Sequence, residues 1–299
     1  MGTQVTIKFQ HDDKLEATQL MEQGLSIFRA VDRQMSPHKK DSELSRINQL
    51  AYKQALMVTD NLFALIGKAQ QLSALTNGAF DITYASVGYL YDYRGGKKPA
   101  ENALVVALPA VNYQSVALDY QQQTIHFKNP KTRIDLGGIG KGYAVDQVIG
   151  FLQQNGVSVA MVSAGGDSRI IGRRPDKPWL IGIKHPRRPG QHALLLPLEE
   201  GAISTSGDYE RYFIDDNGQR HHHILNPKTG KSPQGEVASV SILGPDATTT
   251  DGLSTAVFVL GLDAGLALVN RLPGIEAILV DADGSLHYSN GMAPLTRDW

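Results

Sequence analysis

Residues 133–143 read Arg-Ile-Asp-Leu-Gly-Gly-Ile-Gly-Lys-Gly-Tyr, a glycine-rich turn between two regular elements. The apolar residues before it predict a strand over 132–136. The apolar period after it predicts a helix over 141–154 that Gly156 ends. Glycines let a backbone approach a ligand closely, and the start of a helix offers free N–H groups with a partial positive charge. With the cation of Lys141, this turn suits a phosphate or pyrophosphate, although a tight turn that needs glycine only for packing has the same pattern.

The turn lacks the spacing of two common phosphate-binding motifs. A Walker A loop needs a glycine five residues before Gly140 and a serine or threonine after Lys141, but Asp135 and Gly142 occupy those positions. The dinucleotide motif G-x-G-x-x-G fails because Gly142 follows Gly140 at the wrong spacing. Spacing alone therefore leaves both interpretations of the turn open.

Strand and helix patterns follow one another irregularly along the rest of the chain. Alternation and short apolar runs predict strands over 3–10, 114–119, 123–128, 158–163, 179–184, 193–198 and 237–243, a strand pair around Asn217-Gly218 and a hairpin across 281–284. Helical spacing predicts helices over 14–34, 60–77, 249–260 and 263–271. The polar, Gly/Pro-rich stretch 94–102 is the best candidate for a loop or insertion. Without a regular βαβ rhythm, this mixture predicts an α+β fold.

Composition narrows the class of protein. The chain has 299 residues, enough for one large domain or two closely associated ones, and we expect a single domain over 1–299. A net charge of −1 gives no overall basic field, so we expect no nucleic-acid partner. The absence of cysteine excludes disulfides, thiolate catalysis and Cys-ligated metals.

Membrane and targeting signals are also missing from the sequence as written. No apolar run reaches the roughly 18 residues that span a bilayer, so we expect no integral membrane segment. Residues 1–10 alternate like a strand and have no apolar signal-peptide core. We therefore expect a cytoplasmic protein, or a periplasmic or membrane-anchored one if a leader has been removed.

Asp251 and Thr255 are four residues apart on the predicted helix 249–260, so they share one face. A carboxylate and a hydroxyl are two oxygen ligands for a hard cation such as Mg²⁺, which usually keeps waters and substrate phosphates as its other ligands. The alternative is that Asp251 and the threonines at 248–250 only cap the helix.

Three consecutive histidines occupy positions 221–223, just before Asn226 and a Pro-Gly turn. A strand points His221 and His223 to one face and His222 to the other, so the three do not converge on a metal and Zn²⁺ is not expected. One inward histidine is a candidate general base near neutral pH, and the alternative is a polar edge strand.

Two further polar turns, at 164–167 and 205–208, have side chains that suit a ligand or an ordinary turn. In the segment 78–83, the carboxylate of Asp81 suits a ligand or a structural cap. A rival class, the penicillin-recognising acylases, is suggested by Ser36-x-x-Lys39 and Lys228-Thr-Gly230. The contexts do not match, because a charged segment follows the first motif and Pro227 precedes the second.

Taken in order, several of these segments resemble the FAD:protein FMN transferase family, known as ApbE. The matching blocks span almost the whole chain and are Met1-Gly-Thr3, Met35-Ser36, Asp41-Ser-Glu-Leu-Ser-Arg-Ile-Asn48, Gly78-Ala-Phe-Asp-Ile-Thr83, Asp135-Leu-Gly-Gly-Ile-Gly-Lys-Gly-Tyr-Ala-Val-Asp146, Ser163-Ala-Gly-Gly-Asp167, Ser204-Thr-Ser-Gly-Asp-Tyr209, His223-Ile-Leu-Asn-Pro-Lys-Thr-Gly230 and Thr250-Asp-Gly-Leu-Ser-Thr-Ala256. Each block is weak alone, but the ordered set is highly specific. The resemblance implies an α+β, T-fold-like architecture of largely antiparallel sheets packed with helices.

The resemblance also implies site residues and partners. Mg²⁺ would be bound by Asp251, Thr255 and the backbone carbonyl of Gly138, and His223 matches the histidine that acts as the base. The positions implied to contact FAD are Met1, Ala79, Phe80, Asp81, Asp135, Lys141 and Leu225, with His38 where the family often has a stacking aromatic residue. FAD would be the substrate, and the acceptor a threonine or serine hydroxyl in a partner redox flavoprotein.

Two alternative functions would use the same site. An FAD pyrophosphatase would release FMN and AMP to water, and a non-catalytic protein would bind FAD unchanged. The oxygen pair at Asp251 and Thr255 argues against simple flavin storage, which needs no metal. Many ApbE relatives are exported lipoproteins with a lipobox cysteine, which this sequence lacks.

Overall fold

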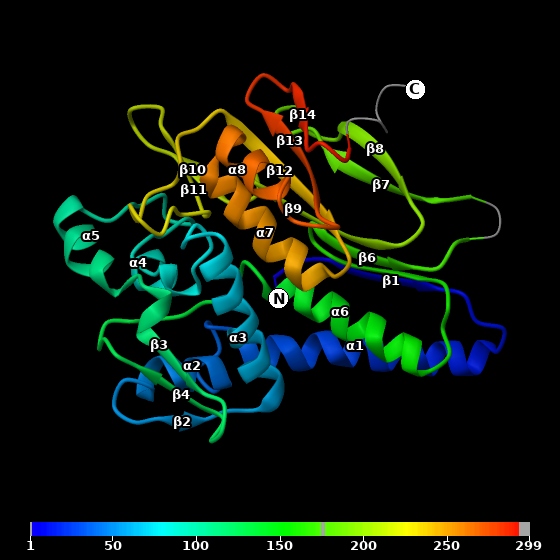
Figure 1. Cartoon of the computed structure of the whole chain (residues 1–299), viewed down its shortest axis with the longest axis horizontal. Coiled ribbons are helices and arrows are strands. Elements are labelled where there is room, and N and C mark those ends of the chain that lie inside the picture. The colour runs from blue at the N-terminus through cyan, green and yellow to red at the C-terminus, as the bar shows by residue number, and fades with distance from the viewer. Residues whose placement is uncertain (1, 175–176, 293–299) are drawn as a thin grey trace. The chain divides into compact units, whose positions relative to one another are not determined.

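A computed structural model describes residues 2–174 and 177–292 (Figure 1). The chain divides into two compact units, each assembled from separate segments of sequence. The first unit consists of Met1–Asp32, Ile139–Gly207 and Glu236–Trp299, and the second of Arg33–Gly138 and Asp208–Gly235. The expectation of a single domain over 1–299 stays a prediction. Met1, one of the expected FAD contacts, lies outside the described residues.

Within its described residues, the first unit is built on a seven-stranded sheet in which every neighbouring pair is antiparallel. In sheet order the strands are β1 (Val5–Phe9), β5 (Ala160–Ala164), β6 (Asp167–Ile171), β9 (Gly201–Gly207), β12 (Val237–Gly244), β13 (Glu276–Asp281) and β14 (Leu286–Tyr288). The first six residues of β12 are buried, as expected for a central strand covered on both faces.

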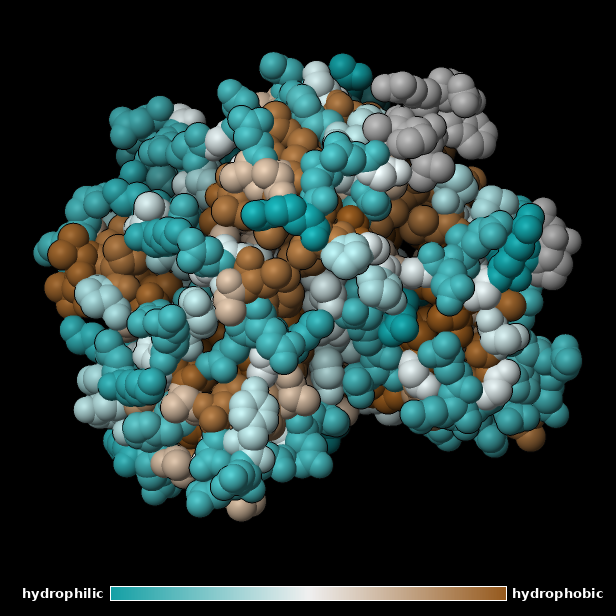
Figure 2. All heavy atoms as spheres, viewed as in Figure 1, coloured by the Kyte–Doolittle hydropathy of each residue, from teal (hydrophilic) through white to brown (hydrophobic). Residues whose placement is uncertain are grey.

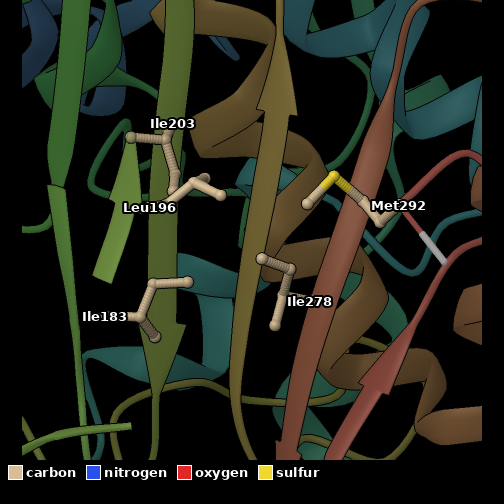
Figure 3. Close-up of a cluster of buried hydrophobic side chains, with 5 residues drawn as sticks. All are labelled: Ile183, Leu196, Ile203, Ile278 and Met292. Carbon is tan, nitrogen blue, oxygen red and sulfur yellow. The ribbon is translucent and has the colours of Figure 1, made fainter. Parts of the chain in front are cut away.

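Helices complete the first unit: α6 (Gly140–Gln154), α7 (Ala247–Leu260), α8 (Leu262–Val269) and most of α1 (Lys14–Met35). α7 packs on β9 and β12, and α6 packs on β5, β6 and α7. A separate hairpin of β7 (Trp179–Lys184) and β8 (His192–Leu198) joins the main sheet through an apolar cluster of Ile183, Leu196, Ile203, Ile278 and Met292 (Figure 3).

The second unit is mainly helical. Its helices are α2 (Glu43–Leu50), α3 (Asp60–Leu75), α4 (Ala85–Gly88) and α5 (Glu101–Ala107), with the short 3-10 segments η1 (Ile82–Tyr84), η2 (Leu108–Ala110) and η3 (Tyr113–Ser115). Its strands form a three-stranded sheet of β2 (Leu56–Met57), β4 (Thr124–Phe127) and β3 (Val116–Asp119) and a ribbon of β10 (Tyr212–Ile214) and β11 (Arg220–His222). Hydrophilic side chains cover much of the visible face in Figure 2, and hydrophobic ones gather over α5, where Val105 and Val106 are exposed.

The predicted α+β class is confirmed, and most predicted elements lie within a few residues of the observed ones. The strand expected over 132–136 is wrong. That segment is held by a side chain: the Ile134 N–H donates to Asn48 Oδ1 at 2.8 Å, and Asn48 Nδ2 donates to the Ile134 carbonyl at 2.9 Å. Both backbone groups of Ile134 are therefore satisfied without a partner strand. No helix in the described part of the chain is long and apolar enough to cross a bilayer.

Candidate active site

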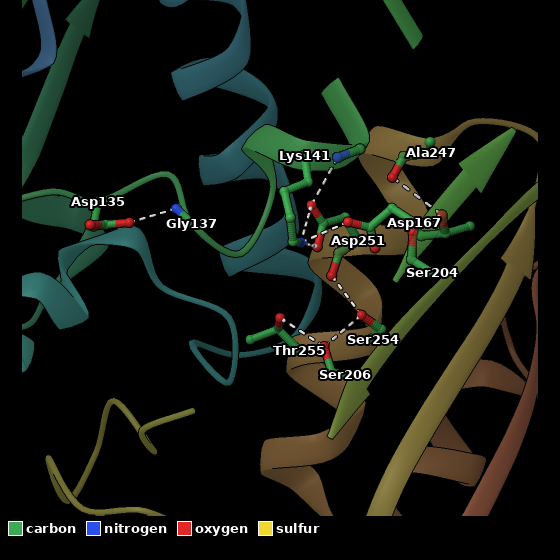
Figure 4. A network of polar contacts seen from close by, with 12 residues as sticks. Asp135, Gly137, Lys141, Asp167, Ser204, Ser206, Ala247, Asp251, Ser254 and Thr255 are labelled. Carbon is green, nitrogen blue, oxygen red and sulfur yellow. Dashed lines mark hydrogen bonds and ion pairs between the residues drawn. The ribbon is translucent and has the colours of Figure 1, made fainter. Parts of the chain in front are cut away.

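Two buried carboxylates share one ammonium group beside the start of α6 (Figure 4). Nζ of Lys141 lies 2.7 Å from Oδ2 of Asp167 and 3.1 Å from Oδ1 of Asp251. Lys141 is in the first turn of α6, Asp167 opens β6 after a Gly-Gly turn, and Asp251 is on the second turn of α7. The fold of the first unit thus brings together three charged residues from sequence segments that are far apart.

The charges in this cluster do not balance. With both carboxylates ionised, the three groups carry one net negative charge. Burial raises the pKa of Asp167 to about 7, and the negative charge of Asp251 adds to the increase while Lys141 opposes it. Burial acts to lower the pKa of Lys141, but Asp167 and Asp251 outweigh it, so the pKa of Lys141 is raised and the ammonium stays charged. Above about pH 7, where Asp167 is ionised, the excess negative charge makes the cluster a suitable place for a further cation.

The entrance of α6 binds a carboxylate of the protein itself. The backbone N–H of Gly142 donates to Oδ2 of Asp251 at 3.0 Å. This is the chemistry that the sequence predicts for a phosphate at this helix start, supplied here by α7. A Cβ at position 142 would lie 2.0 Å from the carbonyl oxygen of Ala247, so only glycine allows the two helix starts to come this close. For Gly142, the packing interpretation is therefore correct.

Hydroxyl oxygens continue the cluster along α7. The hydroxyl of Ser206 on β9 lies 2.8 Å from that of Ser254 and 3.3 Å from that of Thr255. Asp251 and Thr255 are both on α7, as the sequence predicts, and the N-cap of that helix is Asp246, which accepts the N–H of Thr249 at 2.7 Å. The capping role considered for Asp251 on its own helix is therefore not observed.

The oxygen atoms of this cluster fit a hard cation. Asp167 and Asp251 offer carboxylate oxygens, and Ser206, Ser254 and Thr255 offer hydroxyl oxygens. Oxygen atoms are the ligands that Mg²⁺ prefers. Among the residues that the structure describes, no three His, Cys, Asp or Glu side chains gather as a metal cage. A partial oxygen set is what Mg²⁺ usually takes from a protein, because waters and substrate phosphates complete its coordination. Gly138, the third expected ligand, belongs to the second unit.

Asp135 forms a second polar centre, within the second unit. Its Oδ1 accepts the N–H of Gly137 at 2.6 Å, and the hydroxyl of Tyr84 donates to the same carboxylate (Figure 4 shows the first bond). Burial raises the pKa of Asp135, while this N–H, His38, Tyr84 and Arg211 act in the opposite direction. Burial also raises the pKa of Tyr84 well above its usual value, so the phenol stays protonated and able to donate. Asp135 and His38, both expected to contact FAD, are thus close enough to interact electrostatically.

The three histidines have different surroundings. Nε2 of His221 lies 3.0 Å from Oδ2 of Asp215, which also pairs with Lys98 at 2.7 Å. Burial lowers the pKa of His222, whose Nε2 lies 3.1 Å from the carbonyl of Pro233. His223 follows β11 and is half-buried, and its Nδ1 lies 3.3 Å from the carbonyl of Arg211. A neutral ring that donates from Nδ1 has its lone pair on Nε2, which is the form a general base needs.

Four other expected FAD contacts already have structural partners. Ala79 and Phe80 are buried beside the end of α3, and Leu225 packs in an apolar cluster with Val87 and α5 residues. The carboxylate of Asp81 caps η1 by accepting the N–H of Thr83 at 2.8 Å, and it also accepts the N–H of Tyr113 at 2.9 Å. The structural-cap alternative for Asp81 is therefore observed, and FAD contact at these four positions stays a prediction.

Known proteins resemble this chain over most of its length. The ApbE family profile matches residues 1–279. This chain belongs to the ApbE family. It is 34% identical over 283 residues to the FAD:protein FMN transferase of Haemophilus influenzae, covering 91% of this chain and 82% of that protein. The Vibrio cholerae FAD:protein FMN transferase is 33% identical over 97% of this chain and 88% of its own length. The crystal structure of the ApbE protein of Thermotoga maritima superposes with a TM-score of 0.86 at 33% identity, covering 99% of this chain and all of that one.

Within this ApbE fold, the sequence patterns alone did not single out Asp167, Ser206 and Ser254 as members of the charged cluster. Asp167 appears only as the end of a polar turn, and Ser206 lies in β9, where the sequence pattern suggested a turn. One available signal was an acidic residue immediately after a Gly-Gly turn that ends a buried strand, because such a carboxylate needs a cation nearby.

Asp167→Asn is expected to make the stability of the metal-free protein depend less on pH. Because the folded pKa of about 7 exceeds the ordinary 3.8, the folded state holds the proton more tightly than the unfolded state. The stability that this contributes is full below the ordinary pKa and is lost as pH rises through about 7. The melting temperature of the wild type should therefore fall, relative to the variant, between about pH 4 and about pH 8. Thermal unfolding in a chelator at a series of pH values checks this, and a constant difference between the two proteins would contradict it.

Proposed function

We propose that this protein is an FAD:protein FMN transferase, which cleaves FAD and attaches the FMN half to a hydroxyl of another protein. Relatives carrying that name match more than nine-tenths of the chain. The observation that carries the chemistry is the shared Lys141 ammonium between Asp167 and Asp251 at the start of α6. Lys141 provides a cation for a pyrophosphate, and the two carboxylates provide oxygen ligands for a divalent metal.

The metal in this proposal is Mg²⁺, held by Asp251 and Thr255 with the carbonyl of Gly138. When bound, Mg²⁺ neutralises charge on the pyrophosphate and on the departing phosphate. The support for this choice is the all-oxygen donor set and the excess negative charge of the cluster.

Residues of the chain carry the remaining steps. Lys141, held beside two carboxylates, contributes positive charge to the pyrophosphate. The oxygen of the acceptor hydroxyl forms a bond to the FMN-side phosphorus, and His223 takes the proton of that hydroxyl. The bond between this phosphorus and the bridging oxygen breaks, and AMP leaves with the electron pair. The protein needs no nucleophile of its own, because the acceptor supplies the attacking oxygen.

The acceptor in this proposal is a threonine or serine of a redox flavoprotein. Water in place of that hydroxyl would release FMN and AMP, so FAD hydrolysis is the nearest alternative activity. The relatives named as transferases favour the protein acceptor.

Incubating the wild-type protein with FAD, Mg²⁺ and a flavoprotein acceptor is expected to yield the acceptor with covalently attached FMN, plus one AMP per FMN transferred. Intact-mass spectrometry of the acceptor and chromatography of the nucleotides measure both products. An acceptor variant with alanine at the modified hydroxyl is the control and should stay unmodified. AMP and free FMN without modified acceptor would indicate the hydrolase instead, and unchanged FAD would contradict catalysis altogether.

A further inference from the structure

At the starts of α6 and α7, a carboxylate of each helix accepts backbone N–H groups of the other. Asp251 on α7 accepts the N–H of Gly142 on α6 at 3.0 Å. In the opposite direction, Asp146 on α6 accepts the N–H groups of Ala247 and Thr248 on α7 at 3.0 and 2.7 Å. Asp146 also accepts the Thr248 hydroxyl. Each helix therefore satisfies free N–H groups at the start of the other.

Asp146 differs from an ordinary helix cap. The local cap of α7 is Asp246, which accepts the N–H and the hydroxyl of Thr249 at 2.7 and 2.8 Å. Asp146 comes from a different helix and is itself oriented by Arg169 on β6, whose NH1 lies 2.8 Å from its Oδ1. Asp246 therefore stabilises α7 alone, whereas Asp146 fixes α7 relative to α6.

The close approach of the two helices at Gly142 means that a small movement of α7 would displace the carboxylate of Asp251. A Cβ at Gly142 would also lie 2.8 Å from Cβ of Asp251, so the backbone of α6 lies directly against the residue that holds the carboxylate. Thr248 is three residues before Asp251, within one helical turn. A small rotation of that first turn would move the Asp251 carboxylate away from both Gly142 and Lys141.

We propose that Asp146 is a positioning residue that holds the carboxylate of Asp251 in the geometry required for the cation site. This rests on the proposed function only in assigning a divalent metal to Asp251. Asparagine at 146 would retain one acceptor oxygen, but its NH₂ group would face the backbone and hydroxyl donors of α7 or the guanidinium of Arg169. The first turn of α7 would lose part of its anchorage although the side chain keeps its size.

The first test compares Asp146→Asn with the matched control Asp246→Asn, because both weaken the start of the same helix. Titrating each protein with Mn²⁺ as a probe, followed by electron paramagnetic resonance, measures metal affinity without turnover. We expect Asp146→Asn to weaken binding by about 10- to 100-fold, the range observed when a group that orients a metal ligand is lost. Asp246→Asn should lower the melting temperature but keep the wild-type affinity. Unchanged affinity in Asp146→Asn, or equal losses in both variants, would overturn the proposal.

A second measurement needs no metal. The Gly142 amide reports the position of Asp251 directly, because it donates to that carboxylate. Its hydrogen exchange in metal-free protein, followed by NMR, should be faster in Asp146→Asn than in wild type and unchanged in Asp246→Asn. If wild type binds no Mn²⁺, the metal assignment fails while this exchange result still decides whether Asp146 positions Asp251. Equal exchange in all three proteins would overturn the positioning role even if metal binds.

Discussion

Replacing Asp251 by alanine is expected to abolish Mg²⁺-dependent FMN transfer. The carboxylate has three roles: proposed metal ligand, ion pair for Lys141 at 3.1 Å, and acceptor for the N–H of Gly142 at 3.0 Å. Alanine removes all three, so the proposed metal loses its only charged ligand among the three assigned. Initial rates of AMP release and of acceptor modification over a range of Mg²⁺ concentrations measure the loss.

A control must separate loss of chemistry from loss of folding. Alanine leaves the half-buried Lys141 paired with Asp167, which changes local stability as well as metal binding. Asp251→Asn keeps an oxygen that can accept the N–H of Gly142 but removes the charge. If asparagine restores the melting temperature without restoring transfer, the charge is needed for catalysis. Transfer at the wild-type rate in the alanine variant would remove Asp251 from the metal site.

His223→Ala is expected to lower FMN transfer by ~10²–10⁴-fold while FAD binding is retained, if this ring removes the proton of the acceptor. The contact between Nδ1 and the carbonyl of Arg211 at 3.3 Å supports the tautomer with its lone pair on Nε2. Pre-steady-state rates with saturating FAD and acceptor measure the chemical step, and fluorescence quenching of the flavin measures binding.

Rescue by added imidazole distinguishes a base from a residue that only shapes the site. Imidazole should restore part of the lost rate in the alanine variant only, because it can accept the proton that the missing ring would take. A variant that transfers FMN at the full rate, or that does not respond to imidazole, would contradict a role for His223 as the base.

Local patterns predicted much of the fold because they reflect which faces are buried. The alternation of 3–10 corresponds to β1, and the helical spacing of 14–34 and 249–260 corresponds to α1 and α7. The missed α2 has eight residues, too few for a clear period, and it is marked mainly by the cap in which Ser42 accepts the N–H of Ser45. The error at 132–136 has a long-range cause, since Asn48 replaces the expected strand partner.

The candidate site was likewise predicted only in part. The spacing of Asp251 and Thr255 on one helix, and a cation at the start of another, were visible in the sequence. The pairing of Lys141 with Asp167 was not, because it depends on how β6 and α6 pack. The glycine-rich turn was ambiguous for a physical reason: Gly142 is required by a neighbouring helix, and a ligand-binding glycine follows the same pattern.

The position of β12 in the sheet affects how the chain is made. This strand pairs with β9 on one side and β13 on the other, yet it begins only at Val237. During synthesis the ribosome therefore completes β1, β5, β6 and β9 before the strand that covers β9 exists. Until then β9 has an edge of unpaired backbone N–H and C=O groups, which can pair with other nascent chains. A transcript truncated before Val237 should accordingly yield an insoluble product, and slow translation just upstream of β12 would prolong the period in which chaperones are needed.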